Sequence, residues 1–201
     1  MIAVVDYGRG NLFSAGQALR HLGAKYEITA DPNVVLRAER IVLPGVGTFG
    51  DCMTGLRAHG LIEALRSAAA GGVPMLGICV GAQVMLDSGE EFGHHEGLGL
   101  VSGTARRLPE GNGGTSSIRI PNVGWRSLRI RGDFFRGTPD GTMVYFVHSN
   151  APFVARNEDV AATIAINGID VPAAFQRRNI VGFQFHPEKS GSVGLELFDR
   201  F

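Results

Sequence analysis

The stretch from Pro74 to Leu86, PMLGICVGAQVML, places Cys79, one of only two cysteines in the chain, between Gly77 and Gly81. The pattern G-x-C-x-G between an expected strand and an expected helix is typical of a nucleophile elbow, where a sharp turn presents a reactive side chain. A side chain in place of either glycine would collide across such a turn. A buried structural cysteine is the alternative, and this pattern alone leaves both interpretations open.

The elbow belongs to a regular alternation of strands and helices in the first 90 residues. Short β-branched runs alternate with longer segments that end near glycine. The expected strands are Ile2–Asp6, Tyr26–Thr29, Ile41–Leu43 and Pro74–Ile78, and the expected helices are Leu12–Leu22, Met53–His59, Leu61–Ala70 and Val80–Leu86. This alternation predicts an α/β fold with an open, mostly parallel sheet and helices on both faces.

The second half of the chain has a different pattern, in which short strands follow one another closely. The expected strands lie within residues 97–108, 126–130, 142–149, 160–168 and 171–185. They predict an antiparallel extension of the sheet. A solvent-exposed loop is expected over Pro109–Ser117 and a final helix over Leu195–Phe201. Because no repeat or interdomain linker is visible, we expect a single domain over residues 1–201.

Composition and charge favour an ordinary globular protein. The chain is 44% hydrophobic, and its 19 basic side chains balance 19 acidic ones. A net charge of zero predicts no electrostatic surface for nucleic acid or for an anionic membrane. No window approaches the roughly 18 apolar residues of a membrane-spanning helix. Two cysteines do not make a disulfide framework, so we expect a cytoplasmic protein.

The segment FQFHPE, residues 183–188, ends an alternating strand with a histidine and a carboxylate. A cysteine nucleophile needs a base for its proton, and the imidazole needs an acceptor that fixes its tautomer. Backbone N–H groups at a helix N-terminus also favour the thiolate. A structural or surface histidine is the alternative. We therefore take Cys79, His186 and Glu188 as the candidate catalytic residues.

A glycine-rich loop follows the strand expected at Ile41–Leu43. Its G-x-G-x-x-G pattern over residues 45–50 is a weak match to a dinucleotide fingerprint, because it lies outside the first βα unit and no acidic residue occurs near residue 70. A glycine-rich strand end can also direct backbone N–H groups at a developing oxyanion. Val46 and Val80 would form such a pair. We expect no cofactor, and the histidine spacing predicts no metal site.

Taken together, these residues resemble the class I (triad) glutamine amidotransferases, for which GICVGAQ at residues 77–83 and a late HPE are typical. Further segments in matching order resemble the glutaminase subunits of this family that serve histidine biosynthesis. They are DYGRGN (6–11), LPGVGTFGD (43–51), GLGL (97–100), VGW (123–125), YFVHS (145–149) and GFQFHPEKSG (182–191). The resemblance covers essentially the whole chain.

The resemblance implies hydrolysis of glutamine to glutamate and ammonia. Cys79 would be the nucleophile, His186 the general base and acid, and Glu188 the group that orients His186. The implied oxyanion and substrate residues are Gly45, Val46, Gly47, Val80, Gln83 and Ser149. The ammonia would pass to a (β/α)8-barrel cyclase in a heterodimer, giving imidazole glycerol phosphate and aminoimidazole carboxamide ribotide. The expected interface residues are Tyr7, Asn11, Asn122, Trp125 and Lys189.

The chain departs from the family pattern at several positions. Asn122 and Arg126 stand in PNVGWR where the family usually has PHxGWN, and Asn150 stands where an aromatic residue is usual. The altered PNVGWR segment favours one alternative, a glutaminase that supplies a different synthase such as a sugar amidotransferase. A non-catalytic regulatory scaffold and a generic cysteine hydrolase are further alternatives. Because glycines flank Val46, its peptide can flip, and we expect the isolated chain to be nearly inactive.

Overall fold

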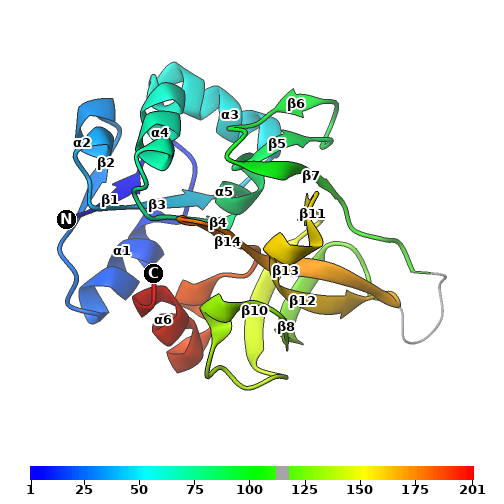
Figure 1. Ribbon diagram of the computed structural model, residues 1–201. Coiled ribbons are helices and arrows are strands. Elements are labelled where there is room, and N and C mark those ends of the chain that lie inside the picture. Colours follow the sequence, from blue (N-terminus) through cyan, green and yellow to red (C-terminus); the bar gives the residue numbers. More distant parts are fainter. Residues whose placement is uncertain (112–117) are drawn as a thin grey trace.

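The computed structural model describes residues 1–111 and 118–201, so most of the loop expected at Pro109–Ser117 lies outside the described residues. An eight-stranded sheet with the order β2-β1-β3-β4-β14-β13-β12-β9 runs through the molecule (Figure 1). The parallel part consists of β2 (Tyr26–Thr29), β1 (Ile2–Val5), β3 (Arg40–Gly45), β4 (Met75–Cys79) and β14 (Ile180–Phe183). The antiparallel part adds β13 (Ile169–Arg177), β12 (Val160–Ile166) and β9 (Arg129–Ile130).

Two smaller sheets complete the second half of the chain. One is an antiparallel ribbon of β8 (Asn122–Ser127) and β10 (Met143–His148). The other has the order β11 (Asn150–Val154), β7 (Val101–Arg107), β5 (Leu86–Gly89) and β6 (His95–Glu96). The predicted α/β class, with its mostly parallel sheet and antiparallel extension, is confirmed.

Helices cover both faces of the parallel part of the sheet (Figure 1). On one side lie α1 (Leu12–His21) and α6 (Gly191–Asp199), and on the other α3 (Phe49–Ala58) and α4 (Leu61–Ala70). Shorter helical segments are α2 (Pro32–Leu36), α5 (Val80–Val84), η1 (Asp133–Phe135), η2 (Asn157–Asp159) and η3 (Pro187–Lys189). Polar side chains cap two of the long helices, because Asn11 accepts from Ser14 N in α1 and Thr48 accepts from Asp51 N in α3.

Several expected boundaries were wrong. The helix expected over Met53–His59 begins four residues earlier, at Phe49, and the strand expected within residues 126–130 is divided between the end of β8 and β9. The helix expected over Val80–Leu86 ends at Val84, because Leu98 N and Leu100 N donate to the carbonyls of Val84 and Met85 and divert the chain into β5. The final helix begins at Gly191, four residues before the expected Leu195. The sequence reading also missed α2, β5, β6 and β11. These elements are two to five residues long, too short for a periodic pattern.

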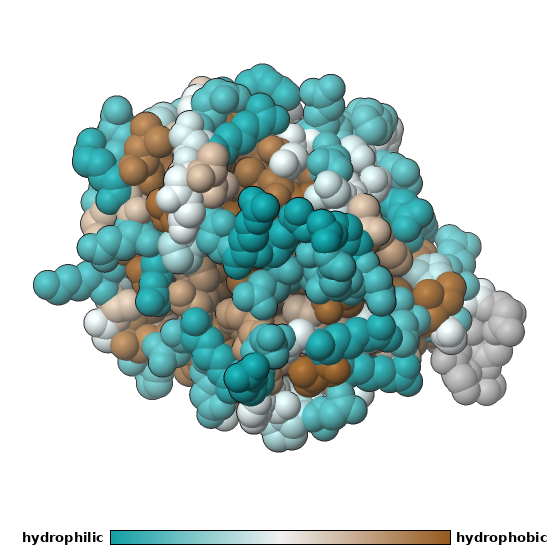
Figure 2. All heavy atoms as spheres, viewed as in Figure 1, coloured by the Kyte–Doolittle hydropathy of each residue, from teal (hydrophilic) through white to brown (hydrophobic). Residues whose placement is uncertain are grey.

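The core lies on both faces of the parallel strands, and all five residues of β4 are buried. The face seen in Figure 2 is mostly hydrophilic, with hydrophobic residues exposed in small separate areas. Among the helices of the described residues, none is both long and apolar enough to cross a membrane. Since β1, β3, β4 and β14 are parallel, the turns that follow them meet at one edge of the sheet.

Candidate active site

Cys79 is the last residue of β4 and immediately precedes α5. Its backbone adopts φ 55° and ψ −117°, a conformation that non-glycine residues rarely take and that is concentrated at functional sites. A Cβ at Gly77 would lie 2.6 Å from Ala82 Cα, and a Cβ at Gly81 would overlap the carbonyl oxygen of Leu43. Both flanking glycines are therefore required by close backbone approach, as the elbow pattern predicted.

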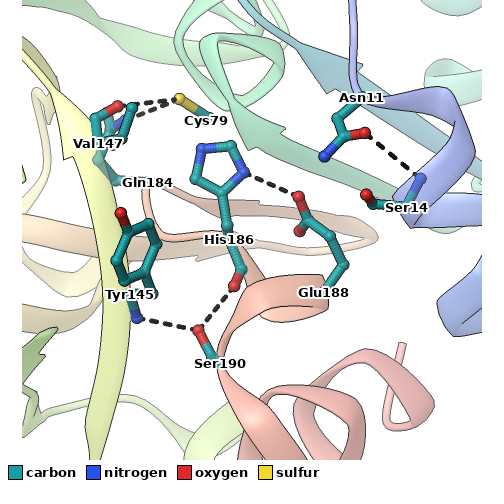
Figure 3. A network of polar contacts seen from close by, with 9 residues as sticks. All are labelled: Asn11, Ser14, Cys79, Tyr145, Val147, Gln184, His186, Glu188 and Ser190. Carbon is teal, nitrogen blue, oxygen red and sulfur yellow. Dashed lines mark hydrogen bonds and ion pairs between the residues drawn. The ribbon is translucent and has the colours of Figure 1, made fainter. Parts of the chain in front are cut away.

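The register of the central sheet brings His186 to Cys79. Strand β14 pairs in parallel with β4, and Phe183 lies opposite Ile78, so the residues that follow both strands share one edge. In Figure 3 the imidazole of His186 lies between Cys79 and Glu188. The main chain of His186 is fixed on both sides. Its N–H donates to the Tyr145 carbonyl at 3.0 Å, and its carbonyl accepts from Ser190 Oγ at 2.6 Å.

The imidazole is buried between a sulfur and a carboxylate. His186 Nδ1 lies 2.9 Å from Glu188 Oε1, and the two side chains are only 4% and 2% exposed. Burial lowers the pKa of His186, but contacts with Cys79 and with Glu188 outweigh it and raise this pKa to about 10. Because Nδ1 faces the carboxylate, Nε2 is left for the thiol. This arrangement favours the imidazolium form of His186.

A cavity of about 300 Å³ opens over Cys79 and His186. It brings together most of the predicted oxyanion and substrate residues. Its lining includes Val46, Gly47, Val80, Gln83 and Ser149, and also Glu91, Val123, Val147, His148, Asn150 and Lys189. Its size suits a small ligand of amino-acid dimensions, and Glu91, Lys189 and the polar side chains supply the convergent polar groups that orient one.

The glycine-rich loop after β3 forms one wall of this cavity. Gly45 pairs with Cys79 across β3 and β4, and a Cβ there would overlap Gly81 N. Gly47 has φ +92°, and a Cβ there would meet nothing within 4 Å. Val46, between them, is 39% exposed. One glycine therefore fixes the loop against the elbow, and the other leaves room for the next peptide to change orientation.

Two predicted interface residues need correction. Tyr7 is only 2% exposed, and its hydroxyl donates to the Pro44 carbonyl at 2.6 Å. Asn122 is fully buried, and its Nδ2 donates to His148 Nε2 at 2.8 Å. Neither side chain offers surface to another protein. Trp125, by contrast, is 45% exposed.

The remaining interface candidates differ in exposure. Lys189 is exposed at the cavity, whereas Asn11 is half-buried at the start of α1.

The site also contains residues that the sequence pattern did not indicate, among them Gln184, Ser190, Glu91 and His148. Gln184 contacts the sulfur of Cys79, and Ser190 contacts the carbonyl of His186. Glu91 and His148 line the cavity. Burial lowers the pKa of His148 to about 4, although a hydrogen bond to the Asn150 carbonyl opposes this. A signal existed for Gln184, which lies two residues before His186 and so on the same side of an extended strand. The other three residues carry no comparable pattern.

The fold and this arrangement of cysteine, histidine and glutamate define a class of enzymes. The sequence model described as Glutamine amidotransferase class-I matches residues 3–201, and the chain belongs to this family.

Within the family the chain is similar to proteins named imidazole glycerol phosphate synthase subunit HisH. That of Moorella thermoacetica is 44% identical over 202 residues, covering 100% of this chain and 93% of its own. That of Geobacter sulfurreducens is 44% identical over 203 residues, covering 100% and 97%.

Solved structures agree on the fold. PurLQS from Thermotoga maritima superposes with a TM-score of 0.74 at 20% identity, covering 99% of this chain and 95% of that one. A crystal structure of a glutamine amidotransferase gives a TM-score of 0.72 at 19% identity, covering 99% and 97%. At these identities the likeness concerns the fold alone.

Proposed function

We propose that the chain is the glutaminase subunit of an imidazole glycerol phosphate synthase and acts as one domain over residues 1–201. The observation that carries the chemistry is the row of Cys79, His186 and Glu188 at the cavity. The single domain is supported by the central sheet, because β4 and β14 come from different halves of the chain and pair directly. Both cysteines are free thiols, which suits the cytoplasm.

The reaction begins with the Cys79 thiolate. Its sulfur attacks the side-chain amide carbon of glutamine, and the C–N bond breaks as a thioester forms. The imidazolium of His186 gives its proton to the departing nitrogen, which leaves as neutral ammonia. His186 then takes a proton from water, and the resulting hydroxide attacks the thioester. The thioester C–S bond breaks, glutamic acid leaves and loses its proton to water, and the Cys79 thiolate beside the His186 imidazolium is restored. Glu188 holds the imidazole tautomer and stabilises its charge throughout.

Backbone groups at the elbow stabilise the tetrahedral intermediates. The N–H of Val80 is suited to be one donor, since Val80 follows the proposed nucleophile and begins α5. The second donor comes from the loop of Gly45, Val46 and Gly47. Gly47 has open space around it, so the peptide between Val46 and Gly47 has room to rotate. We infer that partner binding changes the orientation of this peptide. The isolated chain would then have low activity.

The cavity holds the amino-acid end of glutamine. Glu91 lines it and is suited to the α-ammonium group, while Lys189 and Ser149 are suited to the α-carboxylate. Gln83 forms part of the wall. No cofactor takes part in this chemistry.

The partner is a (β/α)8-barrel cyclase in a heterodimer, and the cavity mouth is the surface that meets it. Val46, Val123, Trp125 and Val147 are each 39–52% exposed. Val123 pairs with Val147, and Trp125 with Tyr145, so these side chains lie on one face of the β8–β10 ribbon. Apolar side chains around a reactive centre suit a partner that excludes water and receives ammonia before it is protonated.

The test mixes the purified chain with the histidine-pathway barrel cyclase and measures glutamate release. We expect strong stimulation by the barrel together with its ribonucleotide substrate, and no turnover for Cys79→Ala. Glu188→Gln should lose most of this turnover. Its matched control is Glu196→Gln, because Glu196 is exposed on α6. Absence of stimulation by this barrel would direct the search to another synthase. Turnover by Cys79→Ala would exclude Cys79 as the nucleophile.

A further inference from the structure

The sulfur of Cys79 has a hydrogen-bond donor that the reaction above does not use. Gln184 Nε2 lies 3.6 Å from Cys79 Sγ, and Gln184 has no exposed surface. We infer that Gln184 stabilises the Cys79 thiolate by donating this hydrogen bond, and that Gln83 positions the Gln184 amide. The inference rests on the proposed role of Cys79 as the nucleophile.

The direction of the Gln184 amide is set by a chain of partners that ends on the backbone. Gln83 Nε2 donates to the Asn150 carbonyl at 2.9 Å and to Gln184 Oε1 at 2.8 Å. A backbone carbonyl only accepts, so the end of the Gln83 amide that faces it must be the NH₂ group. Gln184 therefore turns its oxygen toward Gln83 and its NH₂ group toward the sulfur.

A hydrogen-bond acceptor at the same sulfur has the opposite effect. The Val147 carbonyl lies 3.8 Å from Cys79 Sγ and accepts from the neutral thiol, so it favours S–H. A hydrogen bond donated to the ionised form favours that form. Gln184 thus offsets the carbonyl, and it does so without a charge of its own. The nearby ionisable groups are His186, Glu188, Glu91, His148, Lys189, Tyr7 and Cys52.

The test measures the rate of Cys79 alkylation by iodoacetamide as a function of pH. Gln184→Met keeps the length of the side chain and removes the donor. We expect alkylation of Cys79 near neutral pH to slow about tenfold, because the thiolate loses the donor that favours it. Gln176→Met is the matched control, because Gln176 is half-buried on β13 and does not line the cavity. An unchanged profile for Gln184→Met overturns the inference.

A second measurement uses the unsubstituted chain and decides the matter if Gln184→Met does not fold. The Gln184 side-chain NH₂ resonances should shift with pH at the midpoint of Cys79 alkylation. This pH-dependent change in chemical shift should be lost in Cys79→Ala. If the unsubstituted chain shows no such change, the hydrogen bond is refuted. Neither measurement uses glutamine. A failed glutaminase assay therefore bears on the proposed function alone, and a flat pH response bears on Gln184 alone.

Discussion

Replacement of Gly77 by alanine should damage activity more than stability. Gly77 does not have a positive φ, so the penalty is steric. The added Cβ would lie 2.6–2.8 Å from Ala82 Cα, Ala82 N and Gly81 O, whereas ordinary contact begins at 3.4 Å. These are backbone atoms of α5, so β4 and α5 must separate by up to about 0.8 Å. Overpacking of this kind costs about 1–3 kcal/mol, which lowers Tm by roughly 2–12 °C in a chain of this size.

The same displacement moves the Cys79 sulfur relative to His186 and to the loop of Gly45, Val46 and Gly47. Catalytic groups must be held within about 0.5 Å, and a misplacement of about 1 Å costs roughly 100-fold in rate. We therefore expect a loss of about 100-fold in partner-stimulated kcat/KM for glutamine, measured with thermal unfolding on the same samples. Gly71→Ala is the control, because Gly71 is exposed and right-handed at the end of α4. Unchanged kcat/KM and Tm for Gly77→Ala would refute the steric account.

Three further predictions follow from the buried ionisable groups. Glu188→Gln should reduce glutaminase kcat roughly 1,000-fold or more by disturbing the His186 tautomer. Because the folded-state pKa of His186 is about 10 and its ordinary value is 6.5, the stabilisation that Cys79 and Glu188 give the charged imidazole is complete below 6.5 and lost as pH rises through 10. Urea unfolding should therefore show the largest wild-type advantage over Glu188→Gln at acidic to neutral pH. The pKa of His148 is lowered to about 4, so nitrogen NMR should find it neutral at pH 5, and stability should decline as pH falls from 6.5 to 4; a charged ring at pH 5 would contradict its buried setting. Burial raises the pKa of Cys52 to about 11, so iodoacetamide near neutral pH should label Cys79 and spare Cys52, as read by peptide mass.

The sequence predicts the parts of the fold that repeat a local rule. The parallel strands are continuous apolar runs, and the elbow glycines follow from the turn that they flank. Cys79, His186 and Glu188 were chosen as candidates because each residue type has a defined task in nucleophilic catalysis. Their proximity was a hypothesis, since 107 positions separate the cysteine from the histidine in the chain.

What the sequence could not supply depends on tertiary partners. The helix after Cys79 ends at Val84 because the carbonyls of Val84 and Met85 accept hydrogen bonds from N–H groups within residues 98–100. The local sequence contains no residue that predicts this end. Burial was missed for the same reason. Asn122 looks like a surface polar residue in sequence, yet it is enclosed and donates to a histidine 26 positions away. Such contacts can be read only from the assembled fold.

The segment FQFHPE shows how one strand end serves the core and the site together. Phe183 and Phe185 are fully buried, and their rings stack at 4.6 Å. The alternate residues, Gln184 and His186, face the sulfur of Cys79. Although β14 ends at Phe183, the side chains of this segment still alternate as in a strand, so a one-residue shift would turn the phenylalanines toward the thiol and the polar pair toward the core. The stacked rings oppose that shift, so the packing that stabilises the sheet also sets which groups reach Cys79.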